Sequence, residues 1–209
     1  MSVYPITVAG LQRELPICKV TDDLYIGAFI CFGDAELTVA CAREMLALVD
    51  RDSYDYLFTA EAKSIPLIHE MARQSGADKY FIARKGPKAY MPDPIHVEDK
   101  SITTAGVQKL YLGRDDADLI RGKRILLMDD VISTGGSIHA MEELVKLAGG
   151  TVVGRVAVLA EGEAADRTDI KFLAPCRCST PTAASSEPGV KTAYISKKCG
   201  SYGAAALFL

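Results

Sequence analysis

The stretch that decides the fold of this chain is Arg124-Ile125-Leu126-Leu127-Met128-Asp129-Asp130-Val131-Ile132-Ser133-Thr134-Gly135-Gly136-Ser137. Its first half is apolar without alternation, a pattern that is typical of a strand buried on both faces of a parallel sheet. Two acids and a Gly-rich turn follow, and a helical pattern then runs from Ile138 to Ala148. The stretch therefore predicts a strand, a turn and a helix of an α/β fold.

The turn predicts a binding site for a phosphorylated sugar. A Gly-rich turn before a helix offers free N–H groups and the positive end of the helix dipole, which together hold a phosphate. Gly135 and Gly136 allow a positive φ and a close approach of the backbone. Asp129 and Asp130 would repel a phosphate, so they suit hydroxyl groups or a metal ion instead. A ligand with a phosphate and a nearby diol, such as a ribose 5-phosphate, fits both requirements.

Two other interpretations compete with this site. A strand, a polar turn and a helix also occur in proteins that bind nothing there. The strand also resembles a Walker B strand, but the chain contains no G-x-x-x-x-G-K-[ST] sequence, and no G-x-G-x-x-G follows a strand. The agreement between the two acids and the five loop residues favours the phosphate-sugar site.

This stretch resembles the phosphoribosyl pyrophosphate motif of type I phosphoribosyltransferases, and the resemblance extends to about Pro175. It implies an α/β fold with a central, mostly parallel sheet flanked by helices, a small N-terminal β hood and a flexible lid loop. It also implies that Asp129 and Asp130 hold the ribose 2- and 3-hydroxyls and the water ligands of Mg²⁺. The 5-phosphate would be wrapped by Ser133, Thr134, Gly135, Gly136 and Ser137. The expected partners are phosphoribosyl pyrophosphate, a purine-like base and a second copy in a homodimer.

The composition excludes several other classes of protein. The 209 residues are 49% hydrophobic and carry a net charge of −3, with no basic block, which argues against a nucleic-acid partner. No apolar stretch reaches the length of a membrane span, and no secretory signal opens the chain, so we expect a cytoplasmic protein. The six cysteines are then expected to be reduced. Cys176, Cys178 and Cys199 lack the partners that a zinc site requires.

The N-terminal third predicts a small hood and the first two βα units of a parallel sheet. Asp34 is expected to cap a helix, Pro66 fits a first helical turn, and Gly76 ends that second helix. The expected strands of the antiparallel hood are Val3–Val8, Leu15–Val20 and Leu24–Phe32. The expected helices run from Ala35 to about Val49 and from the Ala60–Ser64 loop to about Gln74, and the sheet strands are Asp55–Thr59 and Tyr80–Ala83.

Basic residues follow these two sheet strands, at the edge that also carries the two acids. The Ala60–Ser64 loop resembles the pyrophosphate loop of adenine and xanthine phosphoribosyltransferases, which implies backbone contacts from Ala62 and Lys63. Arg84 and Lys85 end the second strand, where cations suit a pyrophosphate. Lys88 would reach it from the lid. A solvated pair of basic side chains is the alternative interpretation for Arg84 and Lys85.

The segment from Gly86 to Lys100 has no clear period and is expected to form the lid. Strands are expected at Ser101–Thr104 and Val107–Leu112, a polar connection at Asp115–Arg121, and a last buried strand at Thr151–Ala160. Two markers of base choice are missing. The arm after the lid lacks the Glu of adenine enzymes, and Gly162 stands where xanthine enzymes carry a Lys.

The chain divides into three predicted parts: the hood at residues 1–33, the transferase core at 34–175 and an atypical tail at 176–209. The tail changes character at Cys176, and Cys176-Arg177-Cys178-Ser179 has no helix or strand period. Relatives often end with a strand of the type Leu-Pro-Leu-Phe. Loss of one base from codons for Pro-Leu-Pro-Leu-Phe yields Pro-Cys-Arg-Cys-Ser, so we hypothesise a frame-shifted tail, with an ordinary disordered tail as the alternative.

Two function classes remain open at this point. The first is an enzyme that transfers phosphoribose from its pyrophosphate to a purine-like base, with Asp129, Asp130 and Lys88 in the reaction. The second is a regulator that senses phosphoribosyl pyrophosphate on the same fold without catalysis. Residues 1–33 are too short and too rich in strand character for a DNA-binding winged helix, which favours the enzyme.

Overall fold

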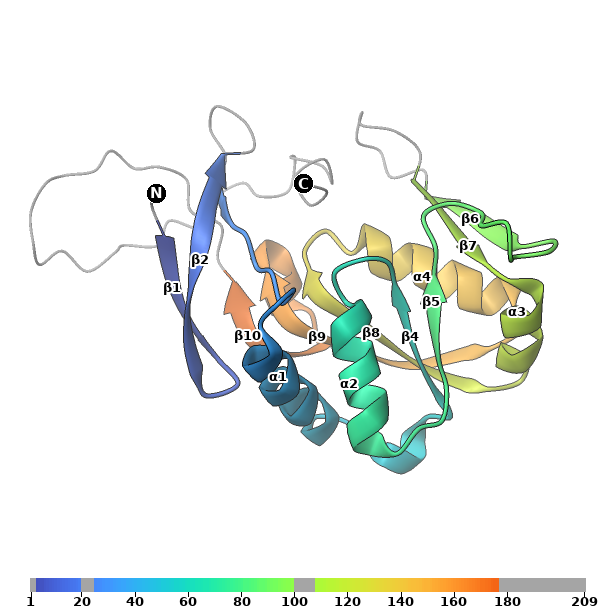
Figure 1. Ribbon diagram of the computed structural model, residues 1–209, viewed down its shortest axis with the longest axis horizontal. Coiled ribbons are helices and arrows are strands. Elements are labelled where there is room, and N and C mark those ends of the chain that lie inside the picture. The colour runs from blue at the N-terminus through green and yellow to red at the C-terminus, as the bar shows by residue number, and fades with distance from the viewer. Residues whose placement is uncertain (1–2, 20–24, 100–107, 177–209) are drawn as a thin grey trace, which may run out of the picture.

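A five-stranded parallel sheet forms the centre of the molecule, in the strand order β10-β9-β8-β4-β5 (Figure 1). The computed structural model describes residues 3–19, 25–99 and 108–176 of the chain. The predicted α/β class with a parallel sheet is confirmed. The strands are β4 (Tyr56–Ala60), β5 (Tyr80–Ala83), β8 (Arg124–Ile132), β9 (Thr151–Glu161) and β10 (Lys171–Cys176).

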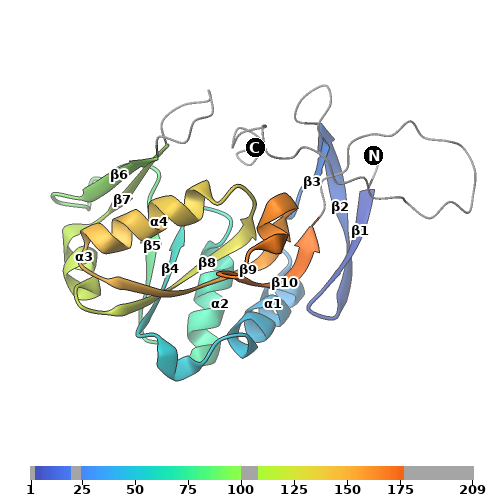
Figure 2. The ribbon, with the colours of Figure 1, turned by 180° about the vertical axis from the view of Figure 1, so that it is seen from behind.

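Helices cover both faces of the sheet. Helices α1 (Ala35–Ala47) and α2 (Ile65–Ser75) lie on one face and α4 (Gly136–Leu147) on the other, as the views from the front and from behind show (Figures 1 and 2). In β8, Leu126 and Met128 belong to the apolar cluster on the α1–α2 side. The alternate residues Ile125 and Leu127 belong to the cluster on the α4 side. The continuous apolar run of β8 is therefore explained by burial on both faces.

The helix boundaries follow the residues expected to set them. Asp34 caps α1 by accepting a hydrogen bond from the Leu37 N–H at 2.9 Å. Pro66 lies in the first turn of α2, where its missing N–H costs nothing. Gly76 ends α2 with a φ of 68°, a left-handed conformation that glycine adopts readily.

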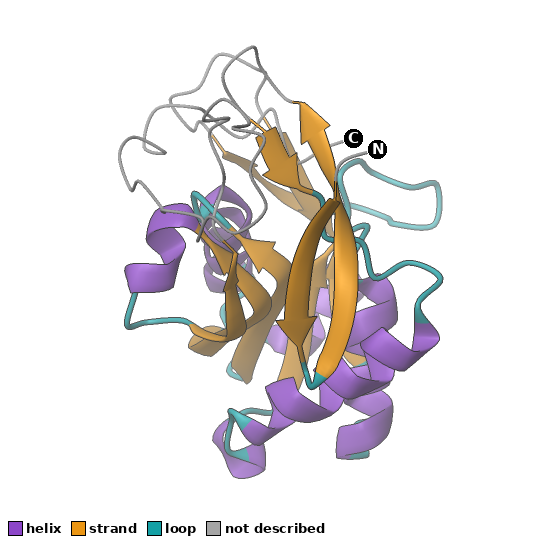
Figure 3. Cartoon of the chain, turned by 90° about the vertical axis from the view of Figure 1, so that its left-hand side faces the viewer, coloured by secondary structure: helices purple, strands orange, loops and turns teal. Residues whose placement is uncertain are grey.

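The predicted N-terminal hood is an antiparallel sheet of three strands, β1-β2-β3. Its hairpin of β1 (Val3–Val8) and β2 (Leu11–Lys19) faces the viewer in Figure 3. Ile6, Val8 and Leu15 are buried in the same apolar cluster as α1, so the hairpin packs against the core. Two boundaries differ from the prediction. Strand β2 begins four residues earlier than Leu15, and β3 (Tyr25–Gly27) covers only a short part of Leu24–Phe32.

Two predictions about the core were wrong: the nature of the Asp115–Arg121 segment, and that the strand at Thr151–Ala160, which is confirmed as β9, is the last one. The expected polar connection Asp115–Arg121 is helix α3 (Arg114–Ile120), which buries Ala117 and Ile120 beneath its charged side chains. The strand at Thr151–Ala160 is not the last one, because β10 pairs in parallel with β9 and closes that edge of the sheet. Its sequence contains a proline, which edge strands tolerate.

The predicted lid contains more regular structure than its sequence indicated. Strand β6 (Ile95–Asp99) lies within the expected lid and pairs antiparallel with β7 (Gln108–Leu112). The predicted strand Ser101–Thr104 lies outside the described residues, as does the predicted tail from residue 177 onward. Cys176, the first residue of the predicted tail, lies in β10 and is buried. Among the described helices, none is long and apolar enough to span a membrane.

Candidate active site

The carboxyl edge of the sheet opens between β4 and β8. The ladder between these two strands stops at the pair Phe58–Leu127, whereas β8 stays paired with β9 as far as Ile132. Beyond the end of the β4–β8 ladder, side-chain hydroxyls form hydrogen bonds with the backbone of β8. The Thr59 hydroxyl donates to the Met128 carbonyl at 2.8 Å, and the Asp130 N–H donates to the Ser64 hydroxyl oxygen at 2.9 Å. The two acids therefore lie beside a gap in the sheet.

Asp129 and Asp130 are brought together at this gap with Ser64. The Ser64 hydroxyl lies 2.8 Å from Asp129 Oδ1 and 3.3 Å from Asp130 Oδ1. Burial raises the pKa of Asp129 well above its usual range, and the neighbouring charge of Asp130 adds to the effect. The Asp130 side chain is buried, and its Oδ2 has no hydrogen-bond partner among the described residues. A buried carboxylate oxygen without a partner is costly, so this atom is suited to a ligand that donates to it.

The predicted phosphate loop follows directly from β8. Gly135 has a φ of 84° and precedes the first residue of α4, Gly136. The loop therefore lies at the N-terminus of α4, where the N–H groups of the first turn lack partners within the helix. Arg167 lies against this loop, with its Nη1 only 2.7 Å from the position that a Cβ at residue 135 would occupy. A cation and a helix N-terminus thus meet at Gly135.

The Arg167 guanidinium is held in place by a carboxylate. Its Nε and Nη2 donate to the two oxygens of Asp169 at 2.9 and 2.7 Å. The remaining nitrogen, Nη1, is the one that approaches Gly135. A fork of two parallel hydrogen bonds fixes the orientation of the guanidinium plane. Arg167 therefore presents its third nitrogen to the phosphate loop.

The predicted pyrophosphate loop lies between β4 and α2. The Glu61–Ala62 peptide bond is cis. The Glu61 carboxylate forms an ion pair with Arg84, and the Lys88 Nζ lies 3.9 Å from Glu61 Oε1. Two of the predicted site cations thus share one carboxylate. The Arg84 backbone also exchanges two hydrogen bonds with Tyr111 of β7, each 2.8 Å long, which joins the base of the lid to the sheet.

Lys63 and Lys85 complete the basic side of the site. Burial lowers the pKa of Lys85, and its electrostatic neighbours include Glu61, Lys63, Asp129 and Asp130. The Lys63 carbonyl accepts a hydrogen bond from the Cys31 thiol at 3.4 Å. The hood segment before α1 therefore contacts the pyrophosphate loop directly. The structure thus brings Lys63, Arg84, Lys85 and Lys88 to the same edge as the acid pair.

A metal ion would find oxygen ligands rather than a closed cage here. In the part of the chain that the structure describes, no three His, Cys, Asp or Glu side chains gather in a metal-binding group. Mg²⁺ usually keeps several of its waters and uses one or two carboxylates together with substrate phosphates. The unpartnered Oδ2 of Asp130 and the adjacent Asp129 fit that arrangement.

Three side chains that were not among the predicted site residues also lie at the site. Glu61 holds two of the cations, Ser64 joins both acids, and Arg167 contacts the phosphate loop. Ser64 had a simpler explanation, because serine commonly caps a helix N-terminus. Arg167 had no local signal, since it lies more than thirty residues along the chain from Gly135.

The chain is similar to known phosphoribosyltransferases. The family model described as "Phosphoribosyl transferase domain" matches residues 36–183. The chain is 30% identical over 156 residues to an adenine phosphoribosyltransferase of Corynebacterium diphtheriae. The aligned region covers 70% of this chain and 82% of that protein. The chain is 31% identical over 122 residues to a hypoxanthine/guanine phosphoribosyltransferase of Methanotorris igneus. Here the aligned region covers 58% of this chain and only 62% of that protein.

The solved structures show the same fold. An adenine phosphoribosyltransferase from Rhodothermus marinus superposes with a TM-score of 0.57 at 20% identity, covering 83% of this chain and 93% of the other. Strand β8, the turn after it and α4 all lie within the matched residues 36–183. The chain belongs to the phosphoribosyl transferase domain family, close to the purine phosphoribosyltransferases.

Proposed function

We propose that this protein transfers phosphoribose from phosphoribosyl pyrophosphate to a purine base and releases pyrophosphate. The observation that carries the proposal is the continuous run of β8, the phosphate loop and α4, with Ser64 of the neighbouring loop hydrogen-bonded to both acids. This arrangement offers an acidic surface for ribose hydroxyls between an anion site at Gly135 and a basic loop at Lys63. The names of the relatives support adenine or hypoxanthine/guanine as the accepted class of base.

The proposed reaction requires charge stabilisation and positioning more than proton transfer. The bond between C1 of the ribose and the pyrophosphate oxygen breaks, and a nitrogen of the base forms a new bond to C1. Negative charge builds on the leaving pyrophosphate, which Lys63, Arg84, Lys85 and Lys88 would stabilise. Asp129 and Asp130 would hold the ribose hydroxyls, and the backbone from Ser133 to Ser137, aided by Arg167, would hold the 5-phosphate.

Mg²⁺ bound through water to Asp129 and Asp130 would neutralise part of the pyrophosphate charge. The pairing of Arg84 and Lys88 with Glu61 suggests an additional role for that acid. Glu61 compensates the positive charge of these two side chains. A bound pyrophosphate would compete with Glu61 for Arg84 and Lys88, because phosphate oxygens and carboxylate oxygens accept hydrogen bonds from the same nitrogen donors.

The first prediction tests binding and turnover separately. Phosphoribosyl pyrophosphate with Mg²⁺ should raise the melting temperature of the protein, because a ligand of the folded state stabilises it by mass action. Asp130→Asn should reduce that shift strongly, since the buried Oδ2 is replaced or reoriented as an amide. Pyrophosphate release should then be measured with adenine, hypoxanthine, guanine and xanthine.

The outcomes distinguish the two function classes. Release of pyrophosphate with one of these bases supports the transferase. A melting-temperature shift without release from any base would instead indicate a regulator that senses phosphoribosyl pyrophosphate. The site assignment is wrong if wild-type protein and the Asp130→Asn variant show the same shift.

A further inference from the structure

Ser64 occupies a helix-capping position without capping the helix. It precedes Ile65, the first residue of α2, and serine at that position normally accepts a hydrogen bond from an N–H of the first turn. Here the Ser64 side chain makes no such bond, and its backbone is already helical, with φ −81° and ψ −3°. The hydroxyl of this fully buried residue is directed instead across the sheet edge, to β8. Its placement is therefore explained by the acid pair and not by the helix.

The hydrogen bonds of Ser64 fix both acids at once. The hydroxyl has one proton, and the 2.8 Å distance to Asp129 Oδ1 identifies this oxygen as the main acceptor, with Asp130 Oδ1 at 3.3 Å. Its oxygen accepts the Asp130 N–H at 2.9 Å, and the same N–H also lies 2.9 Å from Asp129 Oδ1. Ser64, Asp129 and the Asp130 backbone thus form a closed triangle.

This triangle leaves the buried Asp130 Oδ2 available to a ligand. Asp129 Oδ1 and Asp130 Oδ1 are both turned toward Ser64, while the buried Asp130 Oδ2 has no partner among the described residues. Ser64 belongs to the loop that also contains Ala62 and Lys63, the predicted pyrophosphate contacts. The hydroxyl therefore connects the loop for the leaving group to the carboxylates for the sugar.

We propose that Ser64 is a positioning residue for phosphoribosyl transfer: its hydroxyl orients Asp129 and Asp130 so that Asp130 Oδ2 receives a ribose hydroxyl of the substrate. The inference rests on the proposed function, because it takes the ligand of the acid pair to be a ribose. It predicts a specific defect. Removing the hydroxyl should weaken ligands that contain the ribose, while leaving affinity for inorganic pyrophosphate close to that of the wild type.

Thr59 provides a matched control. It is also buried, it lies on the neighbouring strand, and its hydroxyl also bonds to β8, but it donates to the Met128 carbonyl rather than to a carboxylate. Thr59→Val removes this hydroxyl with little change in shape. The Ser64→Ala and Thr59→Val variants therefore each lose one buried hydroxyl that bridges to β8, and only the first touches the acid pair.

The experiment measures the binding of phosphoribosyl pyrophosphate and of inorganic pyrophosphate by calorimetry, with Mg²⁺, for wild type and the two variants. We expect Ser64→Ala to lose about tenfold or more in affinity for phosphoribosyl pyrophosphate, the size of one hydrogen bond to a charged group. Its affinity for pyrophosphate should change less than threefold, and Thr59→Val should bind both ligands as the wild type does. Ser64→Thr, which keeps the hydroxyl, should recover most of the lost affinity.

Three outcomes would overturn the inference while leaving the proposed function intact. In the first, Ser64→Ala binds phosphoribosyl pyrophosphate as the wild type does. In the second, it loses affinity for both ligands equally, which places the effect in the pyrophosphate loop. In the third, Thr59→Val shows the same selective loss. If the wild type binds no phosphoribosyl pyrophosphate, the proposed function fails and the role of Ser64 fails with it.

Discussion

Two features exclude a side chain at Gly135: a positive φ and a close neighbouring atom. Gly10 has only the first of these features. Gly135 and Gly10 both have a strongly positive φ, 84° and 77°. A Cβ at residue 135 would lie 2.7 Å from Arg167 Nη1, whereas nothing lies within 4 Å of a Cβ at residue 10. Gly10 therefore reports the backbone cost of a side chain alone. Gly135 adds the displacement of Arg167 and the obstruction of the phosphate loop.

The variants Gly135→Ala and Gly10→Ala separate these two effects. Both should lose about 1–2 kcal/mol of unfolding free energy, because an L-residue is strained in the left-handed region. Only Gly135→Ala should also weaken phosphoribosyl pyrophosphate binding, by about tenfold or more, through loss of the close backbone approach. Urea unfolding and the ligand-induced shift in melting temperature measure the two effects. Equal ligand binding by the two variants would contradict the assignment of Gly135 to the phosphate site.

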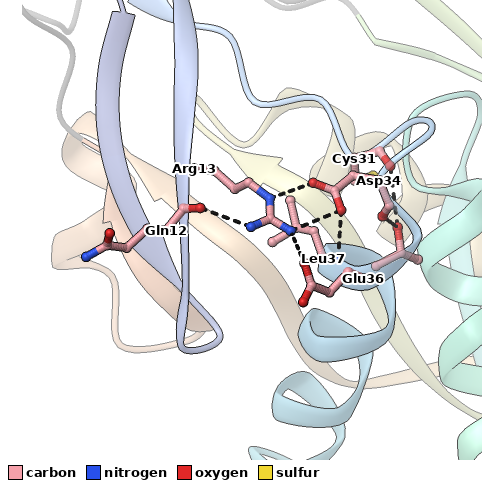
Figure 4. A network of polar contacts seen from close by, with 7 residues as sticks. Gln12, Arg13, Cys31, Asp34, Glu36 and Leu37 are labelled. Carbon is pink, nitrogen blue, oxygen red and sulfur yellow. Dashed lines mark hydrogen bonds and ion pairs between the residues drawn. The ribbon is translucent and has the colours of Figure 1, made fainter.

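Arg13 connects the hood to the first helix of the core. It projects from β2 and meets the start of α1, where its Nε lies 2.7 Å from Asp34 Oδ2 and its Nη2 lies 2.7 Å from Glu36 Oε2 (Figure 4). Asp34 at the same time caps α1 through the Leu37 N–H. The hydrogen bond from Arg13 is the main cause that holds the pKa of Asp34 below its usual value.

We predict that Arg13→Met lowers the melting temperature near neutral pH by a few degrees, about the effect of losing one well-formed ion pair. Asp34 has a lower pKa in the folded state than in the unfolded state. Its pair with Arg13 therefore stabilises the fold above the unfolded pKa, and this contribution is lost as the pH falls through the folded pKa. The difference in melting temperature between the wild type and Arg13→Met should therefore become smaller at acidic pH.

The Arg43–Glu44 pair supplies the control for this prediction. Its side chains are 63% and 42% exposed, compared with 27% and 29% for Arg13 and Asp34. Exposed ion pairs contribute little, so Arg43→Met should leave the melting temperature nearly unchanged. A loss as large as that of Arg13→Met would show that general charge balance, and not the contact between hood and core, determines the effect.

For the whole molecule, paired carboxylates should determine the behaviour in acid. Hydrogen bonds from arginine side chains lower the pKa of Asp55, Glu70 and Asp169 to about 2 each. In each case the folded pKa lies below the unfolded one, so the folded state binds fewer protons in this range. Stability from these pairs is complete above about pH 5 and is lost progressively as the pH falls toward 2.

The corresponding prediction concerns Asp55, which accepts hydrogen bonds from both the backbone N–H and the side chain of Arg124. Asp55→Asn should lower the urea midpoint at pH 7 and should flatten its decrease between about pH 5 and 2, because one titrating group is removed. Asp118→Asn is the control, since Arg121 and Asp118 are 68% and 56% exposed. If the urea midpoints of the two variants depend on pH in the same way, the proposed contribution of Asp55 to acid unfolding is refuted.

The central strand, its acid pair, the phosphate loop and the helix after it could all be predicted from the amino-acid sequence. These are local features, set by an unbroken apolar run, by glycines that allow a positive φ and by helical periodicity. The start of α1 and the end of α2 could be predicted in the same way, because Asp34 and Gly76 act within one helical turn of the residues they serve. The resemblance to the phosphoribosyltransferases rested on the same contiguous residues, and the family match agrees with it.

Which distant residues meet at the site depends on the packing of the folded chain and could not be predicted from local patterns. Helix α3 is too short to display a clear period, and β10 is recognisable as a strand through its pairing with β9. Arg167 reaches Gly135 and Arg13 reaches Asp34 across long sequence separations, which no local pattern records. The position of Ser64 in the sequence, directly before α2, is typical of a serine that caps a helix. Its hydroxyl serves Asp129 instead because the β4 ladder ends at Phe58 and leaves the backbone and carboxylates of β8 to be satisfied by side chains.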